Sequence, residues 1–356
     1  MPSVENAPTK FDASIHLCYK KPEKVVTMSE LKLEGQGISD VGVTAPFPLF
    51  TREGVTALRR EIFSEAVYDK YSLESPITAF QGREFPKEVC PFIHEAWSSP
   101  EVLAAVSEAA GIDLVPIMDL EFGSTNFQLP SGLDRDGFLS TSHDPKPQPL
   151  MTAEQDKEAR EKAEADSGDG SSFVKYHRDA YPFVAVLMLS DVHGMHGGET
   201  AVRTGDGRTL KVRGPSVGSC VVLQGRHITH AALRAYGAGE RCTLVTSFRA
   251  RDPMVNDASV LPTIRIISKK NRLNYQWTDY RFKLLSERFA IMAKQLEDKK
   301  KSFGPEDDAD GLGGREVVNI EEMTKFIDQQ IAYLETTKRE WMTKEFDEYQ
   351  KDMMTQ

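Results

Sequence analysis

The sequence predicts an α+β protein in which short antiparallel strands close into a sandwich or barrel, with helices before and after them. Segments rich in β-forming residues recur at short intervals between residues 173 and 249, and glycine-rich turns separate several of them. Towards both ends of the chain, apolar residues instead recur every three or four positions, as on amphipathic helices. A jelly roll is one closed form of such a strand arrangement.

The strands predicted for this core cover residues 173–177, 183–190, 199–203, 209–212, 219–224, 226–233 and 241–249. Residues 183–189 are apolar at every position, which is typical of a strand covered on both faces. An earlier stretch, 114–129, also has β character. In it Asn126 and Gln128 lie two residues apart and therefore face the same side.

Two helices are predicted before the strands. The first covers residues 54–71, where apolar residues recur at helical spacing. The second begins at a capping serine, Ser98 or Ser99, continues with Pro100 in the first turn, and ends at Gly111. Both helices are expected to pack as scaffold.

Two more helices are predicted after Pro253, over residues 273–296 and 320–342. We expect them to support the outside of the sheet or to form a homodimer face. The resulting organisation is an N-terminal arm at 1–45, a main domain at 46–265 and a C-terminal helical extension at 266–356.

The main domain carries an insertion at about residues 144–172 that is dominated by Pro, Asp, Glu, Lys, Ser and Gly. It has almost no apolar anchor, so we expect it to be mobile. Its place just before the strand at 173–177 suits a lid, and a solvated linker is the alternative.

Composition excludes several classes of protein. The 356 residues carry a formal net charge of −10, which disfavours general binding to nucleic-acid phosphates and favours a small-molecule substrate. The longest apolar run is too short to span a membrane. No secretory signal pattern begins the chain, so a cytoplasmic location is expected. The four cysteines lack C-x-x-C spacing and are expected to be small buried apolar residues.

Three residues have the types and spacing of a metal site. His177 and Asp179 are two apart at the end of a predicted strand and would share a face, and His230 lies on a distant strand. Two imidazoles and one carboxylate with open positions are the ligand set of non-heme Fe(II) oxygenases. A zinc hydrolase can use the same three residues, so the set alone leaves the metal open.

Other histidines compete for the third ligand position. In RHITHAAL, Ile228, His230 and Ala232 share one face of a strand while His227 lies on the other. The mostly apolar first set suits a barrel interior, so we favour His230 over His227. His193 and His196 lie in a glycine-rich turn, where exposed histidines are common.

The last predicted strand places Arg241, Thr243 and Arg249 on one face, and its opposite face is mostly apolar. A buried arginine needs an anion, and a guanidinium is shaped to hold a carboxylate by two hydrogen bonds. Arg241 therefore indicates a carboxylate-bearing cosubstrate. A salt bridge to an internal Asp or Glu is the alternative.

Together these residues resemble the Fe(II)- and 2-oxoglutarate-dependent dioxygenases over about residues 114–252. In that family a His-x-Asp pair, a distant His and an Arg followed two residues later by Ser or Thr occur in this order. The run from GGETAVRT to SFRAR is similar to fungal members of specialised metabolism. The resemblance implies a double-stranded β-helix (jelly-roll or cupin-like) core.

The resemblance also implies the cofactors and the residues that hold them. His177, Asp179 and His230 would bind Fe(II), and Arg241 with Thr243 would bind the distal carboxylate of 2-oxoglutarate. The cosubstrates would be 2-oxoglutarate and O2, and a small molecule would be hydroxylated, desaturated or cyclised. Further candidates are Asn126 and Tyr176 for the cosubstrate, and Arg249 and Gln128 for a substrate that is amino-acid-like or a fungal secondary metabolite.

Two other function classes stay open from the sequence. A jelly-roll metal-dependent hydrolase or isomerase would use the same three ligands without needing Arg241. A non-catalytic barrel would bind a ligand without forming succinate, and its C-terminal helices would recruit partners.

Overall fold

The computed structural model describes residues 9–74, 80–129, 134–166, 172–214, 216–237, 239–303 and 316–341. The chain divides into two compact units. The first comprises residues 1–251 and 257–268, and the second comprises residues 252–256 and 269–356. All the strands described in the structure belong to the first unit.

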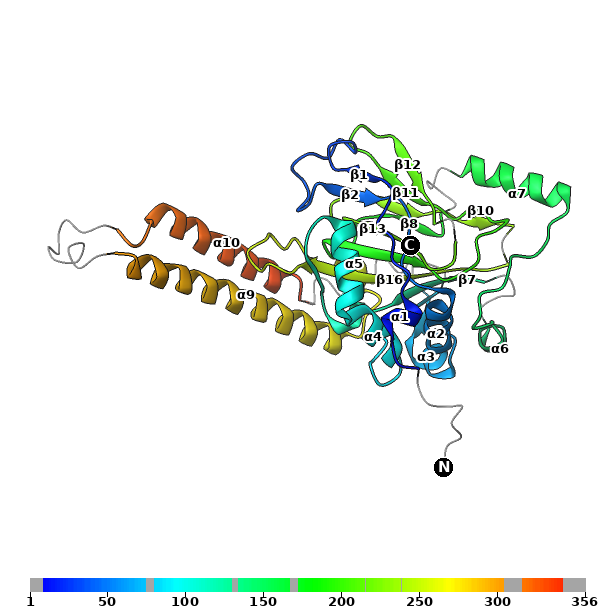
Figure 1. Ribbon diagram of the computed structural model, residues 1–356, viewed down its shortest axis with the longest axis horizontal. Helices are drawn as coiled ribbons and strands as arrows, with labels where there is room; N and C mark the ends of the chain where they lie inside the picture. The colour runs from blue at the N-terminus through cyan, green and yellow to red at the C-terminus, as the bar shows by residue number, and fades with distance from the viewer. Residues whose placement is uncertain are drawn as a thin grey trace, which may run out of the picture. The chain divides into compact units, whose positions relative to one another are not determined.

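In the first unit, helices lie among the strands up to α7, and the strands β8 to β16 then follow one another (Figure 1). The strands are β1 (Val25–Thr27), β2 (Val41–Thr44), β3 (Phe47–Pro48), β4 (Ser72–Leu73), β5 (Gln81–Gly82), β6 (Leu114–Pro116), β7 (Ser124–Gln128), β8 (Val174–His177), β9 (Phe183–Met188), β10 (His196–Gly197), β11 (Thr200–Arg203), β12 (Thr209–Val212), β13 (Ser219–Leu223), β14 (His230–Ala232), β15 (Ala235–Tyr236) and β16 (Arg241–Ala250). The helices are α1 (Ala13–His16), α2 (Arg52–Ile62), α3 (Glu65–Tyr71), α4 (Pro91–Ser98), α5 (Pro100–Ala110), the 3-10 turn η2 (Asp119–Glu121), α6 (Arg135–Leu139), α7 (Ala153–Ala165) and α8 (Pro262–Arg265).

The strands form one large and two small antiparallel sheets. The large sheet has the order β1-β2-β13-β9-β16-β7-β5-β4, with β3 also paired to β13 and β6 to β16. A second sheet has the order β12-β11-β14-β8, and β10 pairs with β15. This mixture of helices and antiparallel sheets agrees with the predicted α+β class.

The two faces of the large sheet are buried against different partners. One face, including Leu187 and Leu244, packs on residues of α2, α4 and α5, which gather along the sheet in Figure 1. The other face, including Val184 and Val221, packs with Val202 of β11. Burial on both faces explains why β9 is apolar at every position, as the sequence indicated.

Most predicted core strands are found within a few residues of their expected bounds. The largest difference is at 226–233, where the strand β14 covers only His230–Ala232 and a turn precedes it. The stretch 114–129 contains two strands, β6 and β7, with η2 between them. Two further strands, β1 and β2, lie within the predicted N-terminal arm and extend the large sheet through β13.

The predicted helix starts and stops are only partly confirmed. Ser99 caps α5 with its side chain, and Gly111 ends this helix in the left-handed conformation at φ 68°. The expected helix at 54–71 is instead two helices, because Ser64 accepts a hydrogen bond from Val67 N and starts a new helix, α3.

The predicted insertion at 144–172 contains an unpredicted helix, α7. Thr152 and Gln155 form a capping box, and charged pairs four residues apart, such as Asp156 and Arg160, support the exposed helix. Asp156 also contacts His196 Nε2 at 2.8 Å, which attaches α7 to β10. Residues 167–171 lie outside the described residues, and the mobility of the segment stays a prediction.

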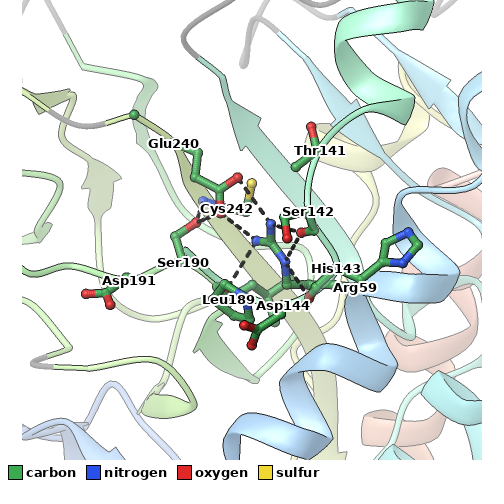
Figure 2. Close-up of polar contacts among 12 residues, drawn as sticks. Arg59, Thr141, Ser142, His143, Asp144, Leu189, Ser190, Asp191, Glu240 and Cys242 are labelled. Atoms are coloured by element: carbon green, nitrogen blue, oxygen red, sulfur yellow. Dashed lines mark hydrogen bonds and ion pairs between the residues drawn. The ribbon is translucent and has the colours of Figure 1, made fainter. Parts of the chain in front are cut away.

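A buried arginine joins α2 to the start of β16 (Figure 2). Arg59 Nη1 donates to Glu240 Oε1 at 2.7 Å and to the Leu189 carbonyl at 3.1 Å. The carbonyls of Ser142 and His143 accept from the same guanidinium. Glu240 immediately precedes Arg241, so this network fixes the point where β16 begins.

The second unit contains the helices α9 (Lys270–Lys301) and α10 (Ile320–Arg339), close to the two predicted C-terminal helices. They pack antiparallel: Trp277 Nε1 donates to the Thr337 carbonyl at 3.2 Å, and Phe289 contacts Phe326 with ring centroids 5.5 Å apart. Exposed apolar side chains recur every seven residues on α9, at Tyr275, Phe282 and Phe289. The homodimer through these helices stays a prediction.

Two expectations from composition can be compared with the structure: the burial of the cysteines and the lack of a membrane-spanning segment. Cys90, Cys220 and Cys242 are buried as expected, but Cys18, which follows the short helix α1, is exposed. Among the described residues, no helix combines the length and the apolar character needed to cross a bilayer.

Candidate metal centre and adjoining cavity

The structure brings His177, Asp179 and His230 together. Their potential ligand atoms all lie within 4.8 Å of one another. His177 Nε2 is 3.2 Å from Asp179 Oδ1, and His230 Nε2 is 3.3 Å from Asp179 Oδ2. Because β8 and β14 pair with His177 opposite His230, the sheet itself sets the separation of the two rings.

Both imidazoles are held in the same orientation. His177 Nδ1 lies 2.7 Å from the Lys175 carbonyl, and His230 Nδ1 lies 2.9 Å from the Ile228 carbonyl. A carbonyl only accepts, so each Nδ1 carries the hydrogen and each Nε2 keeps a lone pair directed towards Asp179. Backbone carbonyls orient metal-binding histidines in this way.

Asp179 lies just beyond the end of β8, where its backbone N–H donates to the Gly225 carbonyl at 2.9 Å. A Cβ on residue 225 would lie 1.8 Å from Asp179 Oδ2, so only glycine leaves room for the carboxylate here. Asp179 Oδ2 is buried and has no hydrogen-bond donor within the described part of the chain. This orphaned oxygen and two imidazole lone pairs fit a divalent cation such as iron or zinc.

His177, Asp179 and His230 change one another's pKa values. Burial opposes protonation of His177, but Asp179 outweighs it and raises the pKa of this imidazole. Burial lowers the pKa of His230 despite the attraction of Asp179. Burial also opposes ionisation of Asp179, yet His230 and His177 together lower the pKa of its carboxyl group. The carboxylate therefore stays ionised and attracts positive charge to this point.

The cluster opens into a cavity of about 140 Å³ between the large sheet and the β12-β11-β14-β8 sheet. Val184, Val186 and Val245 form apolar wall on the large sheet, and Ile264 and Ile267 add to it. A small organic molecule fits such a concave, mostly apolar site with few polar groups.

Arg241 lines the same cavity and is only 2% exposed. Its Nε donates to the Gly198 carbonyl at 3.1 Å, and its buried Nη1 has no hydrogen-bond partner among the described residues. Burial lowers the pKa of Arg241 to about 10, which leaves the guanidinium charged at neutral pH. No acidic side chain in the described part of the chain forms an ion pair with it, so the predicted salt-bridge alternative is not found.

The remaining predicted cosubstrate and substrate residues divide into two groups. Thr243 and Asn126 line the cavity and are directly paired across β16 and β7. Tyr176, Gln128 and Arg249 are not among the lining residues. Their roles stay predictions.

Each of these three has a different contact. The Arg203 guanidinium covers the Tyr176 ring at 3.9 Å. The side chain of Gln128 exchanges two hydrogen bonds with the backbone of Ala235, at 2.7 and 3.1 Å. Arg249 Nη1 donates to the Ala250 carbonyl at 2.8 Å.

The histidine preference agrees with the geometry, although the strand argument behind it does not hold fully. His230 begins β14, whereas Ile228 and His227 lie in the preceding turn. His227 is absent from the ligand cluster found among the described residues. His196 contacts Asp156, and His193 is exposed.

Several polar lining residues escaped the sequence reasoning, among them Gln81, Arg83, Glu121 and Ser124. Gln81 lies on a strand of two residues, too short to give an alternating pattern. The one available signal is that Gln81 and Arg83 are two apart and therefore face the same way on an extended backbone.

Comparison with solved structures found distant likenesses. A prolyl-4-hydroxylase from Pseudomonas putida is 18% identical, with 56% of this chain and 88% of that chain covered and a TM-score of 0.32. An oxidoreductase of the 2OG-Fe(II) oxygenase family from Burkholderia pseudomallei is 12% identical, with 56% and 90% covered and a TM-score of 0.32. The non-heme alpha-ketoglutarate-dependent epimerase SnoN from nogalamycin biosynthesis is 14% identical, with 55% and 73% covered and a TM-score of 0.31.

Each TM-score is below 0.5, so these likenesses assign neither a fold nor an activity to this chain. No family model matches the sequence, and no curated protein matches it.

Proposed function

We propose that this protein is a non-heme Fe(II)- and 2-oxoglutarate-dependent oxygenase that oxidises a C–H bond of a small molecule. The observation that carries the proposal is one cavity lined by both the His177, Asp179 and His230 cluster and the buried guanidinium of Arg241. The first supplies a metal site with open positions, and the second supplies a cation that needs an anionic ligand. The proposed core is a double-stranded β-helix, which the two facing antiparallel sheets support.

His177, Asp179 and His230 would hold the iron, and Arg241 with Thr243 would hold the distal carboxylate of 2-oxoglutarate. When bound, iron and 2-oxoglutarate supply oxygen activation, in which 2-oxoglutarate and O2 give succinate and carbon dioxide as the substrate is oxidised. Thr243 is 2% exposed and lies two residues from Arg241 on the cavity face of β16, so its hydroxyl is available to the same carboxylate.

The other groups in the cavity prepare the site. The carbonyls of Lys175 and Ile228 fix the tautomer of the two histidines before any metal arrives. Apolar side chains such as Val184 and Val245 exclude water from the space next to the cluster. The substrate itself would occupy the part of the cavity away from Arg241.

Anaerobic addition of Fe(II) and 2-oxoglutarate to the full chain tests the proposal. The chelate should give a weak visible charge-transfer band in the wild-type protein, and the band should be lost in His177→Ala. The Arg241→Met variant should need a much higher 2-oxoglutarate concentration to reach the same band. A band of equal strength and midpoint in all three proteins would refute the assignment.

The same preparation separates the two alternatives. Hydrolase or isomerase activity that persists without 2-oxoglutarate and O2 would indicate a metal-dependent enzyme of another class. Ligand binding without any succinate formation across a panel of substrates would indicate a non-catalytic barrel.

A further inference from the structure

A second polar group lines the cavity apart from Arg241. Gln81, Arg83 and Glu121 are 6%, 5% and 4% exposed, respectively, and Ser124 lies beside them on β7. Buried polar groups of this kind are normally saturated with hydrogen bonds. Donors that all have hydrogen-bond partners in the protein would indicate a structural group. Donors without such partners would indicate a ligand-binding group.

Within this group, Glu121 accepts two hydrogen bonds. Arg83 Nη2 donates to Glu121 Oε1 at 2.8 Å, and the Tyr181 hydroxyl donates to the same oxygen at 3.3 Å. The ion pair holds the guanidinium in place on the cavity wall. The Glu121 carboxylate compensates the charge of Arg83, whereas no ion-pair partner of Arg241 is found among the described residues.

Three other atoms have no hydrogen-bond partner within the described part of the chain. Gln81 Nε2, Arg83 Nε and Ser124 Oγ are buried and make no hydrogen bond to the described residues. The first two only donate, and the serine hydroxyl donates or accepts. Leaving several buried donors unpaired in one cavity destabilises the protein unless ordered water or a ligand carries the matching acceptors.

Strand pairing shows where these donors lie relative to Arg241. Gln81 pairs with Asn126, and Asn126 pairs with Thr243. Ser124 pairs with Val245, four residues beyond Arg241 on β16. Four residues of a strand span roughly 13 Å, so Ser124 lies well away from the guanidinium, and Gln81 is separated from β16 by the intervening strand β7. Val245 and Val186 provide apolar wall beside them.

We propose that Gln81, Arg83 and Ser124 form the substrate subsite and recognise a neutral hydrogen-bond acceptor, such as an amide, lactam or ketone carbonyl, on an otherwise apolar small molecule. This inference rests on the proposed oxygenase function, because the molecule bound at these residues is a substrate only if the protein is that enzyme. Gln81 Nε2–H and Arg83 Nε–H donate to the carbonyl oxygen, and the apolar wall contacts the hydrocarbon part. Anionic ligands are disfavoured because Glu121 lies beside Arg83.

Three matched probes test the subsite: benzamide, benzoate and toluene, which share a ring and differ in the polar group. Binding to the full chain is measured by ligand-detected NMR, first without and then with Fe(II) and 2-oxoglutarate under anaerobic conditions. The wild-type protein should bind benzamide more tightly than either other probe. Gln81→Leu should weaken benzamide binding about tenfold and leave toluene binding unchanged.

Gln329→Leu makes the same change at an exposed position on α10 and should change nothing. Ser124→Ala should weaken benzamide binding by a smaller factor, and it replaces Gln81→Leu if the latter does not fold. Unchanged benzamide binding in whichever of these two variants folds would overturn the proposal. Tighter binding of benzoate than of benzamide would overturn it as well.

The charge-transfer band in the same samples keeps the two proposals separate. Benzamide binding that depends on Gln81, together with no band, would refute the oxygenase function but keep the carbonyl subsite. A band with no dependence of benzamide binding on Gln81 or Ser124 would keep the oxygenase and refute the subsite.

Discussion

His177 and His230 lie directly opposite each other on β8 and β14, and each ring is held through Nδ1 by the carbonyl of the residue two positions earlier. Strand pairing and local backbone geometry therefore fix the two imidazoles on the side away from Asp179, and the Asp179 carboxylate contacts both rings at Nε2. The third ligand is fixed differently. Asp179 lies beyond the strand, and its position depends on the contact with Gly225.

Gly225→Ala should therefore weaken metal binding with little effect on folding. The new methyl group would displace the Asp179 carboxylate, whose Oδ2 lies 1.8 Å from that position. We expect the affinity for Fe(II) or Co(II) to fall about 10–100-fold, which is typical when the support of a metal ligand is lost. Titration with Co(II), followed by its visible absorption, measures the change.

Gly214→Ala is the matched control for this variant. Its new Cβ would lie 2.2 Å from Ser219 Oγ, a comparable collision with a side-chain oxygen remote from the cluster. Similar Co(II) affinities in the two variants would show that Gly225 has no special relationship to the metal site.

Arg241→Met should raise stability and strongly weaken cosubstrate binding. A buried guanidinium whose Nη1 has no partner among the described residues is costly, and methionine removes the charge while filling much of the same space. We expect the free energy of unfolding of the metal-free protein to rise by about 1 kcal/mol. At a 2-oxoglutarate concentration that saturates the wild-type protein, the increase in melting temperature caused by 2-oxoglutarate with Co(II) should be much smaller in the variant. A clear loss of stability in the variant would mean that Arg241 is structural.

His227 should make the protein less stable as the pH falls from 6.5 to 4. Burial, with Arg226 and Arg178 nearby, lowers the pKa of this imidazole to about 4. The unfolded chain takes up the proton near pH 6.5 and the folded chain only near pH 4, so acid favours unfolding in this window. We expect an effect on the order of 1 kcal/mol, because solvent reaches part of the ring and screens it.

The His227→Gln variant should remove this part of the pH dependence. Denaturant unfolding at pH 6.5 and 4.5 measures it in the wild-type protein, in His227→Gln, and in His193→Gln as the exposed control. The wild-type and the control should lose more stability between the two pH values than His227→Gln. Equal losses in all three proteins would contradict the assigned pKa.

The alternation along β16 was predictable from the sequence because a ten-residue strand gives a clear two-residue period. Arg241 and Thr243 indeed line the cavity, while Cys242 and Leu244 join the apolar core on the other face. The same alternation extended to Arg249, but the cavity ends before that residue, and periodicity along one strand carries no information on where a cavity ends.

The rest of the site depends on contacts between distant segments. Gln81 reaches the cavity only because the two-residue strand β5 pairs with β7. Gly225 matters only because the chain returns there to Asp179, 46 residues earlier in the numbering (225 − 179). Such pairings are set by tertiary packing, which local propensity and periodicity do not encode.

The ion pair between Arg59 and Glu240 should be among the larger single contributions to the stability of the first unit. Their side chains are 0% and 17% exposed, and the guanidinium also donates to three backbone carbonyls (Figure 2). Arg59→Met would remove the donor of these three carbonyls and the cation paired with the Glu240 carboxylate, which would keep the hydrogen bond from the Ser190 hydroxyl at 3.2 Å. We expect a loss of about 3–5 kcal/mol in the free energy of unfolding.

Arg52→Met is the matched control for Arg59→Met. It removes the exposed pair with Asp144, in which the side chains are 47% and 60% exposed, and should cost less than about 1 kcal/mol. Glu240→Gln combined with Arg59→Met should lose less than the sum of the single variants, because each single change already breaks the pair. Chemical denaturation of the four variants measures these values. Strict additivity, or a loss for Arg59→Met no larger than for Arg52→Met, would show that the buried pair does not stabilise the start of β16.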